Sequence, residues 1–336
     1  MTLPTRPLGI SGLEITTVGL GAWAMGGEKW AYGWGRQDDE ASIATIRHAL
    51  DRGINWIDTA AVYGLGHAEE VVERALRGIP VAKRPLVFTK CGQVWDENNR
   101  MGSNVQNLDP ASIRRECEAS LRRLNIERID LYQFHWPDQT GVAIEDSWGQ
   151  MIRLIEQGKV RSAGVSNFNV PLLERCEALR HVDSLQPPFS LIRRDVAARE
   201  IPWCHQHKTG VIAYSPMQSG LLTDRFSAAR MKQLPADDWR TRSDDFRPPQ
   251  LERNLALRDA LKPIAERHGQ SVGAVAIAWT LAWPGMSGAI VGARSPEQVD
   301  GWIGAATLSL TSQDLGDIQS AIDRTGAGAG PGSPRG

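Results

Sequence analysis

Cysteine is scarce in this sequence and is never paired at short spacing. Four cysteines are scattered among 336 residues, and no two of them form a C-x-x-C pair. Zinc knuckles and small secreted scaffolds need more closely grouped cysteines. His205 and His207 stand two apart on a predicted helix, so their side chains point in different directions and make no metal site. We therefore expect reduced thiols, a cytoplasmic location and no metal.

The sequence also lacks an excess of one charge and any long hydrophobic run. Its net charge is −1, so no broad basic field attracts nucleic acid or an acidic membrane surface. No run approaches the roughly 18 apolar residues of a membrane span. Residues 1–12 have none of the regions that define a signal peptide. These absences favour a small-molecule substrate as the partner. They leave the oligomeric state open, with a monomer preferred.

Apolar strand patterns and amphipathic helix patterns alternate along most of the chain. A tight turn at Ser11-Gly12 predicts a β-hairpin over 8–15. Strands are predicted over 17–21, 54–58, 86–90, 130–134, 160–165, 182–185, 210–214 and 289–291. Helices are predicted over 38–52, 67–76, 111–124, 144–157, 171–179, 196–207, 251–268, 272–282, 296–305 and 312–322. Eight strand–helix units favour a closed parallel barrel.

The predicted fold is therefore α/β. It is a (β/α)8 TIM barrel with an N-terminal β-hairpin and extra C-terminal helices, forming a single domain over 1–325. Residues 217–249 form a polar insertion, whose charged stretch 237–245 is predicted to be solvated, with a flap over the cofactor as the alternative. Residues 326–336 are rich in glycine and proline, and we expect them to be disordered. The motif Gly19-x-Gly21-x-x-Ala24 imitates a dinucleotide fingerprint, but no helix is predicted directly after it.

Four polar residues are predicted at the carboxyl ends of barrel strands, where barrel enzymes keep their active sites. They are Asp58, Lys90, His135 and, in a following loop, Tyr63. Each alone has an ordinary structural explanation, such as a cap, an ion pair or a core histidine. Together they suit carbonyl reduction, because a tyrosine can donate a proton once an ammonium lowers its pKa. Asp58 would balance the buried Lys90, and His135 would orient the carbonyl.

The segments around these residues resemble signature regions of the aldo-keto reductase superfamily. They are 55–60 with Tyr63-Gly64, 88–90, 130–138, 164–168 and 214–216, and the resemblance runs in register from about 8 to 310. The branch that looks closest is bacterial and is also similar to potassium-channel β subunits. The resemblance implies an Asp–Tyr–Lys–His catalytic group at Asp58, Tyr63, Lys90 and His135. It also implies NADPH bound extended over the barrel mouth.

The same resemblance implies a set of cofactor contacts. Ser166, Asn167 and Gln186 match residues that bind the nicotinamide carboxamide, and Tyr214 matches the ring that stacks on nicotinamide. The pyrophosphate loop would comprise Ser215, Gln218, Gly220, Leu221 and Leu222. Gly292, Arg294 and Gln298 would hold the adenosine end, with Arg294 on the 2′-phosphate of NADP. Relatives often have asparagine where this chain has Trp302.

Twelve tryptophans is a high number for this length, and several stand near glycine-rich segments where a pocket could open. Trp23, Trp30, Trp34, Trp95 and Trp136 are the candidates for the pocket mouth. We expect the substrate pocket to be formed by Trp23, Tyr63, Trp95, His135 and Trp136, with Trp23 also reaching the cofactor.

The resemblance implies an NADP-dependent oxidoreductase, an aldehyde reductase that also acts as a glycerol dehydrogenase. Expected substrates are glyceraldehyde-like aldehydes and methylglyoxal, and small polyols such as glycerol in the reverse direction. The alternative is a catalytically inactive, cofactor-binding regulatory subunit of the same fold. The intact group of four catalytic residues favours the enzyme, and turnover would separate the two.

Overall fold

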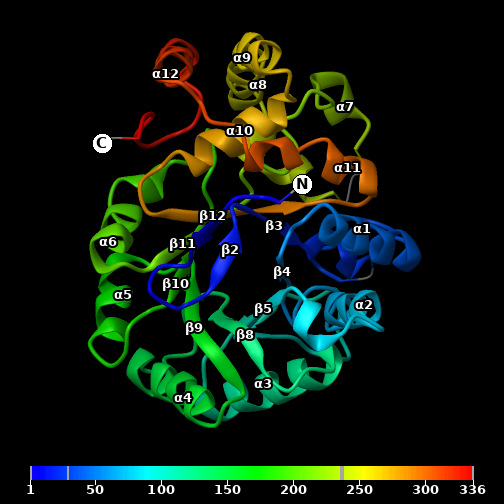
Figure 1. Cartoon of the computed structure of the whole chain (residues 1–336), viewed down its shortest axis with the longest axis vertical. Helices are drawn as coiled ribbons and strands as arrows, with labels where there is room; N and C mark the ends of the chain where they lie inside the picture. The colour runs from blue at the N-terminus through cyan, green and yellow to red at the C-terminus, as the bar shows by residue number, and fades with distance from the viewer. Residues whose placement is uncertain (1, 29, 235–237, 335–336) are drawn as a thin grey trace.

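Eight parallel strands close into a barrel in the computed structural model, which describes residues 2–28, 30–234 and 238–334. Around the barrel the strand order is β10-β11-β12-β3-β4-β5-β8-β9 (Figure 1). The strands are β3 (Val18–Gly21), β4 (Trp56–Asp58), β5 (Leu86–Cys91), β8 (Ile129–Phe134), β9 (Val160–Ser166), β10 (Ser184–Gln186), β11 (Gly210–Tyr214) and β12 (Met286–Gly292). The predicted (β/α)8 barrel is confirmed.

Helices surround the barrel on the outside, as Figure 1 shows. They are α1 (Asp39–Asp51), α2 (His67–Leu76), α3 (Pro110–Leu124), α4 (Ile144–Glu156), α5 (Val170–Glu177), α6 (Glu200–His207), α8 (Gln250–Ala260), α9 (Lys262–His268), α10 (Val272–Leu281), α11 (Pro296–Asp300) and α12 (Ser312–Thr325). Side chains of Asp38 and Asp109 cap the first turns of α1 and α3. In the described part of the chain no helix has both the length and the apolar character needed to cross a bilayer.

Three predicted helices are interrupted in the structure. The helix expected over 251–268 divides at Leu261 into α8 and α9, because Pro263 lacks an N–H and fits only a first turn. The helix expected over 196–207 becomes a 3-10 turn and then α6, which has Pro202 in its first turn. The helix expected over 296–305 ends at Asp300, and a 3-10 turn follows.

The N-terminal hairpin lies where the barrel would otherwise open to solvent at the amino ends of its strands. Its strands are β1 (Thr5–Pro7) and β2 (Glu14–Thr16), so the turn is wider than the predicted one. Leu8 and Leu13 lie in that turn, and a backbone hydrogen bond of 2.8 Å joins them. Both pack into the barrel interior on Trp56 and Phe88. Leu8 and Leu13 therefore lie in the turn and not in the strands, because there their side chains can be buried in the barrel.

The Gly19-x-Gly21 motif serves packing inside the barrel. A Cβ built on Gly19 would lie 2.1 Å from the indole of Trp56, which is fully buried. Only glycine leaves room for that ring. The structure therefore explains the first glycine of this motif without any phosphate contact.

The chain after α12 differs from the predicted disorder at residues 326–330. The guanidinium of Arg194, which is buried, donates to the carbonyl oxygens of Ala327 and Gly330, each at 3.2 Å. Ala329 exchanges backbone hydrogen bonds with the same loop, at Ile192 and Arg194. A buried arginine needs acceptors, and these tail carbonyls supply them. Residues 335 and 336 lie outside the described residues.

Candidate active site

The carboxyl ends of β4, β5 and β8 bring the predicted catalytic residues together. Asp58 ends β4, Lys90 stands in β5, and His135 directly follows β8. Lys90 Nζ donates to Asp58 Oδ1 at 2.5 Å and to the Thr59 carbonyl oxygen at 2.9 Å. The same Nζ lies 5.2 Å from the centre of the Tyr63 ring. The Tyr63 and His135 ring centres are 5.6 Å apart and meet edge to face.

Burial sets the protonation of these groups. It raises the pKa of Tyr63 well above its ordinary value, and the nearby carboxylate of Asp58 raises this pKa further. The sequence suggests that Lys90 lowers the pKa of Tyr63, but the net shift of this pKa is upward. Burial also lowers the pKa of Lys90, against the opposing pull of Asp58. Tyr63 consequently keeps its hydroxyl proton at neutral pH, which suits a proton donor.

His135 is held as a neutral imidazole. Burial lowers the pKa of His135 well below its ordinary value, and the charge of Lys90 lowers it further. Its backbone is fixed from two sides, because its N–H donates to the Cys91 carbonyl at 3.0 Å and its carbonyl accepts from Asn167 Nδ2 at 3.0 Å. A neutral imidazole can donate one hydrogen bond, so His135 can orient a carbonyl oxygen without adding charge.

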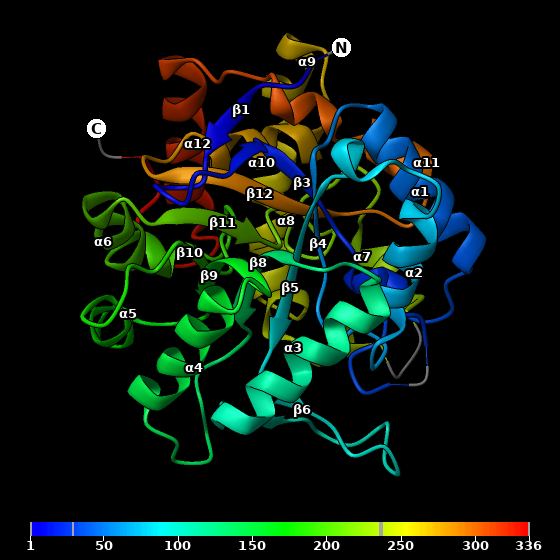
Figure 2. The same cartoon turned by 60° about the horizontal axis from the view of Figure 1, so that its bottom comes forward.

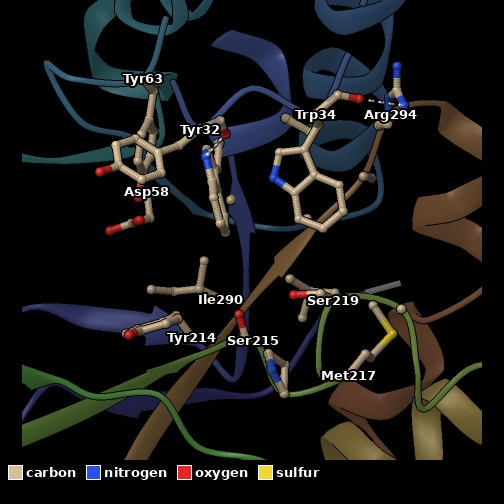
Figure 3. Close-up of a pocket in the computed structure, with 18 of the residues that line it drawn as sticks. Tyr32, Trp34, Asp58, Tyr63, Tyr214, Ser215, Met217, Ser219, Ile290 and Arg294 are labelled. Atoms are coloured by element: carbon tan, nitrogen blue, oxygen red, sulfur yellow. Dashed lines mark hydrogen bonds between the residues drawn. The ribbon is translucent and has the colours of Figure 1, made fainter. Parts of the chain in front are cut away.

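A cavity of about 910 Å³ opens next to these residues and extends across the barrel mouth. In Figure 3, Tyr63, Tyr32 and Trp34 line one wall, and Tyr214, Ser215 and Met217 line the opposite wall. The volume is at the large end of the range for small-molecule sites. The cavity therefore has room for an extended ligand as well as a small substrate beside Tyr63.

Aromatic rings connect the catalytic end of the cavity to the 217–249 insertion. Trp23 is stacked between Tyr63 and Trp239, with ring centres 6.3 Å apart on each side. Trp34 meets both Trp23 and Trp239 edge to face. The described part of the insertion contains α7 (Ala228–Lys232) and the turn Trp239–Arg242. Trp239 therefore packs on the aromatic wall, while other insertion residues such as Arg230 and Arg240 line the cavity itself. Residues 235–237 lie outside the described residues.

The residues expected at the nicotinamide form one hydrogen-bonded network. Tyr214 donates its hydroxyl to Asn167 Oδ1 at 2.9 Å, and Asn167 Nδ2 donates to Ser166 Oγ at 3.0 Å. All three line the cavity, as does Gln186. Gln186 Nε2 donates to Asp58 Oδ2 at 2.9 Å. Gln186 therefore also braces the Asp58–Lys90 pair, a role that the sequence did not indicate.

The predicted pyrophosphate loop divides into lining and supporting residues. Ser215 and Gly220 line the cavity, and both have left-handed backbone conformations, with φ of 56° and 89°. The side chains of Leu221 and Leu222 are fully buried in the core. Gln218 is also buried; it accepts from Ser190 Oγ at 3.0 Å and donates to Asp245 Oδ2 at 2.7 Å. These last three residues hold the loop from behind.

Gly292, Arg294, Gln298 and Trp302 line the far end of the cavity. The Arg294 guanidinium donates to Gln37 Oε1 at 2.7 Å, to the Trp34 carbonyl oxygen at 3.4 Å and to the Arg36 carbonyl oxygen. Gln298 Oε1 accepts from the Arg294 backbone N–H at 2.9 Å. Arg294 thus ties the loop before α1 to the end of β12.

Two predicted pocket residues differ in their placement. Trp136 lines the cavity and is 39% exposed. Trp95 packs against Trp30 and Val62 behind the wall, and its indole N–H donates to Glu97 Oε1 at 2.8 Å. Trp95 is outside the set of residues that line the cavity. Polar residues on either side of Trp95 in the sequence, Gln93 and Asn104 among them, line the cavity instead.

Several lining residues escaped the sequence analysis. Gln93, Asn104 and Gln106 come from a short hairpin of β6 (Gln93–Val94) and β7 (Val105–Gln106). Strands of two residues show no periodicity, so no signal in the sequence marks them. Trp239 of the polar insertion packs on Trp23 and Trp34, which line the cavity. Only its aromatic character, among charged neighbours, could have drawn attention to it.

The cavity fits a dinucleotide cofactor. Trp302 is 3% exposed, and its indole N–H has no partner within the described residues although its ring faces the cavity. In the left-handed turn of Ser215–Gly220, the backbone N–H groups of Gln218 and Gly220 donate within the turn, and those of Ser215 and Ser219 suit phosphate oxygens. Together with the Tyr214 ring and the Ser166–Asn167 pair, these groups could hold the two ends and the middle of such a ligand. Among the described residues, no three histidine, cysteine, aspartate or glutamate side chains are grouped to hold a metal ion.

Comparisons with known proteins agree with this geometry. Residues 17–323 match the aldo/keto reductase family. The chain is 35% identical over 316 residues to the aldo-keto reductase YhdN of Bacillus subtilis, covering 94% of this chain and 92% of that one. It is 30% identical over 332 residues to an NADH-specific methylglyoxal reductase of Escherichia coli, covering 95% and 99%.

Solved structures give the same result. The glycerol dehydrogenase AKR11B4 from Gluconobacter oxydans superposes with a TM-score of 0.85 at 38% identity, over 96% of this chain and 95% of that chain. The holo form of the aldo-keto reductase AKR11C1 from Bacillus halodurans superposes with a TM-score of 0.78 at 23% identity, covering 95% and 96%, and supports the fold alone.

Proposed function

This chain belongs to the aldo/keto reductase family, and we propose that it uses NADPH to reduce small aldehydes and ketones. In the reverse direction it would oxidise small polyols such as glycerol with NADP. The observation that carries the proposal is the buried Lys90–Asp58 pair beside the Tyr63 ring, with the neutral His135 in edge-to-face contact with that ring. Tyr63 keeps its hydroxyl proton at neutral pH and lines the cavity, so it is placed to donate that proton to a carbonyl oxygen there.

The proposed chemistry assigns one task to each side chain. When bound, a reduced nicotinamide supplies the hydride that the carbonyl carbon accepts. Tyr63 donates its hydroxyl proton to the carbonyl oxygen, and the ammonium of Lys90 stabilises the phenolate that remains. Asp58 and Gln186 hold Lys90 in place. His135 donates a hydrogen bond that keeps the carbonyl oxygen beside Tyr63.

The preference for NADPH rests on positive charge at the adenosine end. Arg294 and Arg240 both line the cavity, and Arg240 lies over the Trp34 ring at 5.0 Å. Guanidinium groups bind phosphate through paired N–H donors, so they favour the 2′-phosphate that distinguishes NADPH from NADH. The Escherichia coli relative is NADH-specific by name, and a comparison of KM for NADPH and NADH tests the preference of this chain.

The substrate class draws on the relatives' names and on the cavity. One relative is a methylglyoxal reductase and one structural neighbour a glycerol dehydrogenase. Aromatic rings, among them Trp23 and Trp136, narrow the space near Tyr63 to small molecules. We further propose a monomer that works in the cytoplasm, where its four buried, unpaired cysteines would stay reduced.

The test is an absorbance assay of purified protein with NADPH or NADH and a panel of short aldehydes. Turnover of glyceraldehyde or methylglyoxal with NADPH would support the proposal. Cofactor binding without turnover of any carbonyl would contradict it and favour a regulatory subunit of the same fold.

A further inference from the structure

The β6–β7 hairpin presents three side-chain amides to the cavity on one face. Gln93 and Gln106 stand directly opposite each other in its antiparallel register, so their side chains lie on the same face. Asn104 precedes Gln106 by two residues, and the strand alternation places it on that face as well. All three line the cavity together with Tyr63 and His135. The opposite pair, Val94 and Val105, belongs to the other face, and Val105 is 52% exposed.

These amides are available for a ligand. Within the described residues, no side chain or backbone group forms a hydrogen bond with any of the three amides. Gln93 is nevertheless only 8% exposed. A primary amide offers two donors and two acceptor lone pairs. A ligand hydroxyl, which both donates and accepts, would satisfy such a group.

The backbone that carries the amides is held firmly. Gln139 donates its N–H to the Gln106 carbonyl at 2.9 Å, and Asn107 donates to the Gly92 carbonyl at 3.1 Å. Asp138 accepts from the Leu108 N–H at 3.1 Å. The loop between the two strands extends from the barrel near β6, while the hairpin itself stays beside it (Figure 2). The backbone that carries Gln93 and Gln106 is therefore fixed relative to the catalytic residues.

The neighbouring lining residues carry no net charge. Asp58 is paired with Lys90, and His135 is neutral because burial lowers its pKa. The other described lining residues near Tyr63 are aromatic, like Trp30 and Trp136, or polar and uncharged, like Asn167. Arg294 lies toward the opposite end of the cavity, as Figure 3 shows. This end thus offers hydrogen bonds and ring faces without the cation that a carboxylate or phosphate would need.

We propose that the amides of Gln93, Asn104 and Gln106 bind the hydroxyl groups of a neutral polyhydroxylated carbonyl compound or polyol. By this contact they select such substrates over plain and over phosphorylated aldehydes. The inference rests on the proposed reductase function and deepens it, because it names which of the candidate substrates the site prefers. A dicarbonyl without hydroxyls, such as methylglyoxal, would use these amides less well.

The test compares glyceraldehyde with propanal, which has the same three carbons and no hydroxyl. The ratio of the two kcat/KM values is measured for the wild type and for Gln93→Leu, Asn104→Leu and Gln106→Leu. Val105→Ala on the opposite face is the control. Taking the ratio within each variant cancels any loss of folded enzyme. Each lost hydroxyl contact should lower the ratio about tenfold, because an unpaired polar group costs on the order of 1–3 kcal/mol.

We expect the wild type to favour glyceraldehyde over both propanal and glyceraldehyde 3-phosphate. The ratio should fall in at least two of the leucine variants and stay at the wild-type value in Val105→Ala. An unchanged ratio in all three leucine variants would overturn the inference while leaving the reductase function standing, since propanal would still be reduced. Failure of the wild type to reduce any of these aldehydes would overturn the proposed function itself, and the inference with it.

Discussion

The ammonium of Lys90 lies 2.5 Å from the carboxylate of Asp58, and their side chains are 0% and 3% exposed. A buried ion pair of this kind is poor evidence for stability, because removing both charges from water offsets most of the attraction. The pair matters because it fixes the position of the Lys90 ammonium relative to Tyr63. The pair holds a positive charge below the Tyr63 ring, where a phenolate would form.

Breaking this pair should be costly. Asp58→Asn leaves the Lys90 ammonium buried without a counter-charge, so the free energy of unfolding should fall by about 3–5 kcal/mol. Urea unfolding measures the change. The control is Glu145→Gln, which breaks an ion pair with Arg175 whose side chains are 43% and 50% exposed. That change should cost much less, because water and salt screen an exposed ion pair. Equal losses in the two variants would contradict the account of Lys90.

Glu116 in α3 should make stability depend on pH. Its carboxylate accepts from the Gly92 N–H at 2.8 Å and from Ser112 Oγ at 3.1 Å. Burial raises the pKa of Glu116 to about 7. Because the folded pKa exceeds the unfolded value, its stabilising contribution is complete below about pH 4.5 and is lost as the pH rises through 7. Glu116→Gln, which cannot ionise, should therefore gain in thermal stability over the wild type between pH 5 and pH 8.

Glu118 on the same helix provides the control for that measurement. Its hydrogen bond to Lys159 lowers the pKa of Glu118, so it stays ionised across this interval. The difference in melting temperature between Glu118→Gln and the wild type should be the same at pH 5 and pH 8. A difference for Glu116→Gln that is equally constant would show that Glu116 does not titrate in this range.

Arg294 should discriminate between the two nicotinamide cofactors. If its guanidinium binds the 2′-phosphate, Arg294→Gln should raise KM for NADPH about tenfold or more, since hydrogen bonds to charged groups contribute on the order of 1.5–3 kcal/mol. KM for NADH should change much less. Arg294 also donates to Gln37 and to the carbonyl oxygen of Trp34, so the alternative is a purely structural role. Equal increases for both cofactors would mean that Arg294 only braces the loop before α1.

Trp239 should slow the release of the cofactor. Its stack on Trp23 and its edge contact with Trp34 hold the insertion against the cavity. Trp239→Ala removes both contacts, each of about 0.5–1.5 kcal/mol, so dissociation of NADPH should become roughly threefold to tenfold faster. Stopped-flow fluorescence measures the rate. Lys232→Ala, an exposed change in the same insertion, should leave it unaltered. A wild-type rate in Trp239→Ala would rule out this role for the insertion.

The barrel and the meeting of Asp58, Lys90 and His135 at one end of it could be predicted, because the strand and helix signals are local and repeated. The predicted bounds of β11 and α2 agree with the structure, since glycine, charge and apolar spacing mark both ends. Asp58, Lys90 and His135 follow from where parallel strands end. The hairpin that carries Gln93 and Gln106 could not be predicted, because two residues contain no period.

Long-range contacts account for the other differences. Arg194 donates to carbonyl oxygens of Ala327 and Gly330, which lie more than 130 positions later in the sequence. No local sequence pattern could have predicted these hydrogen bonds. The direction of the Tyr63 pKa depends on how burial compares with the charge of Lys90, and only the packed structure decides that balance. The bracing of Asp58 by Gln186 likewise joins strands that are distant in sequence.

The most direct test is the turnover of glyceraldehyde with NADPH by the wild type and by Tyr63→Phe, with NADPH binding measured for both by fluorescence. Phenylalanine keeps the ring and removes the proton. We predict that NADPH binds both proteins with similar affinity, while kcat falls by about 10²–10⁴-fold in the variant, as for the loss of a general acid. Equal turnover by the two proteins would contradict the assignment of Tyr63 as the proton donor.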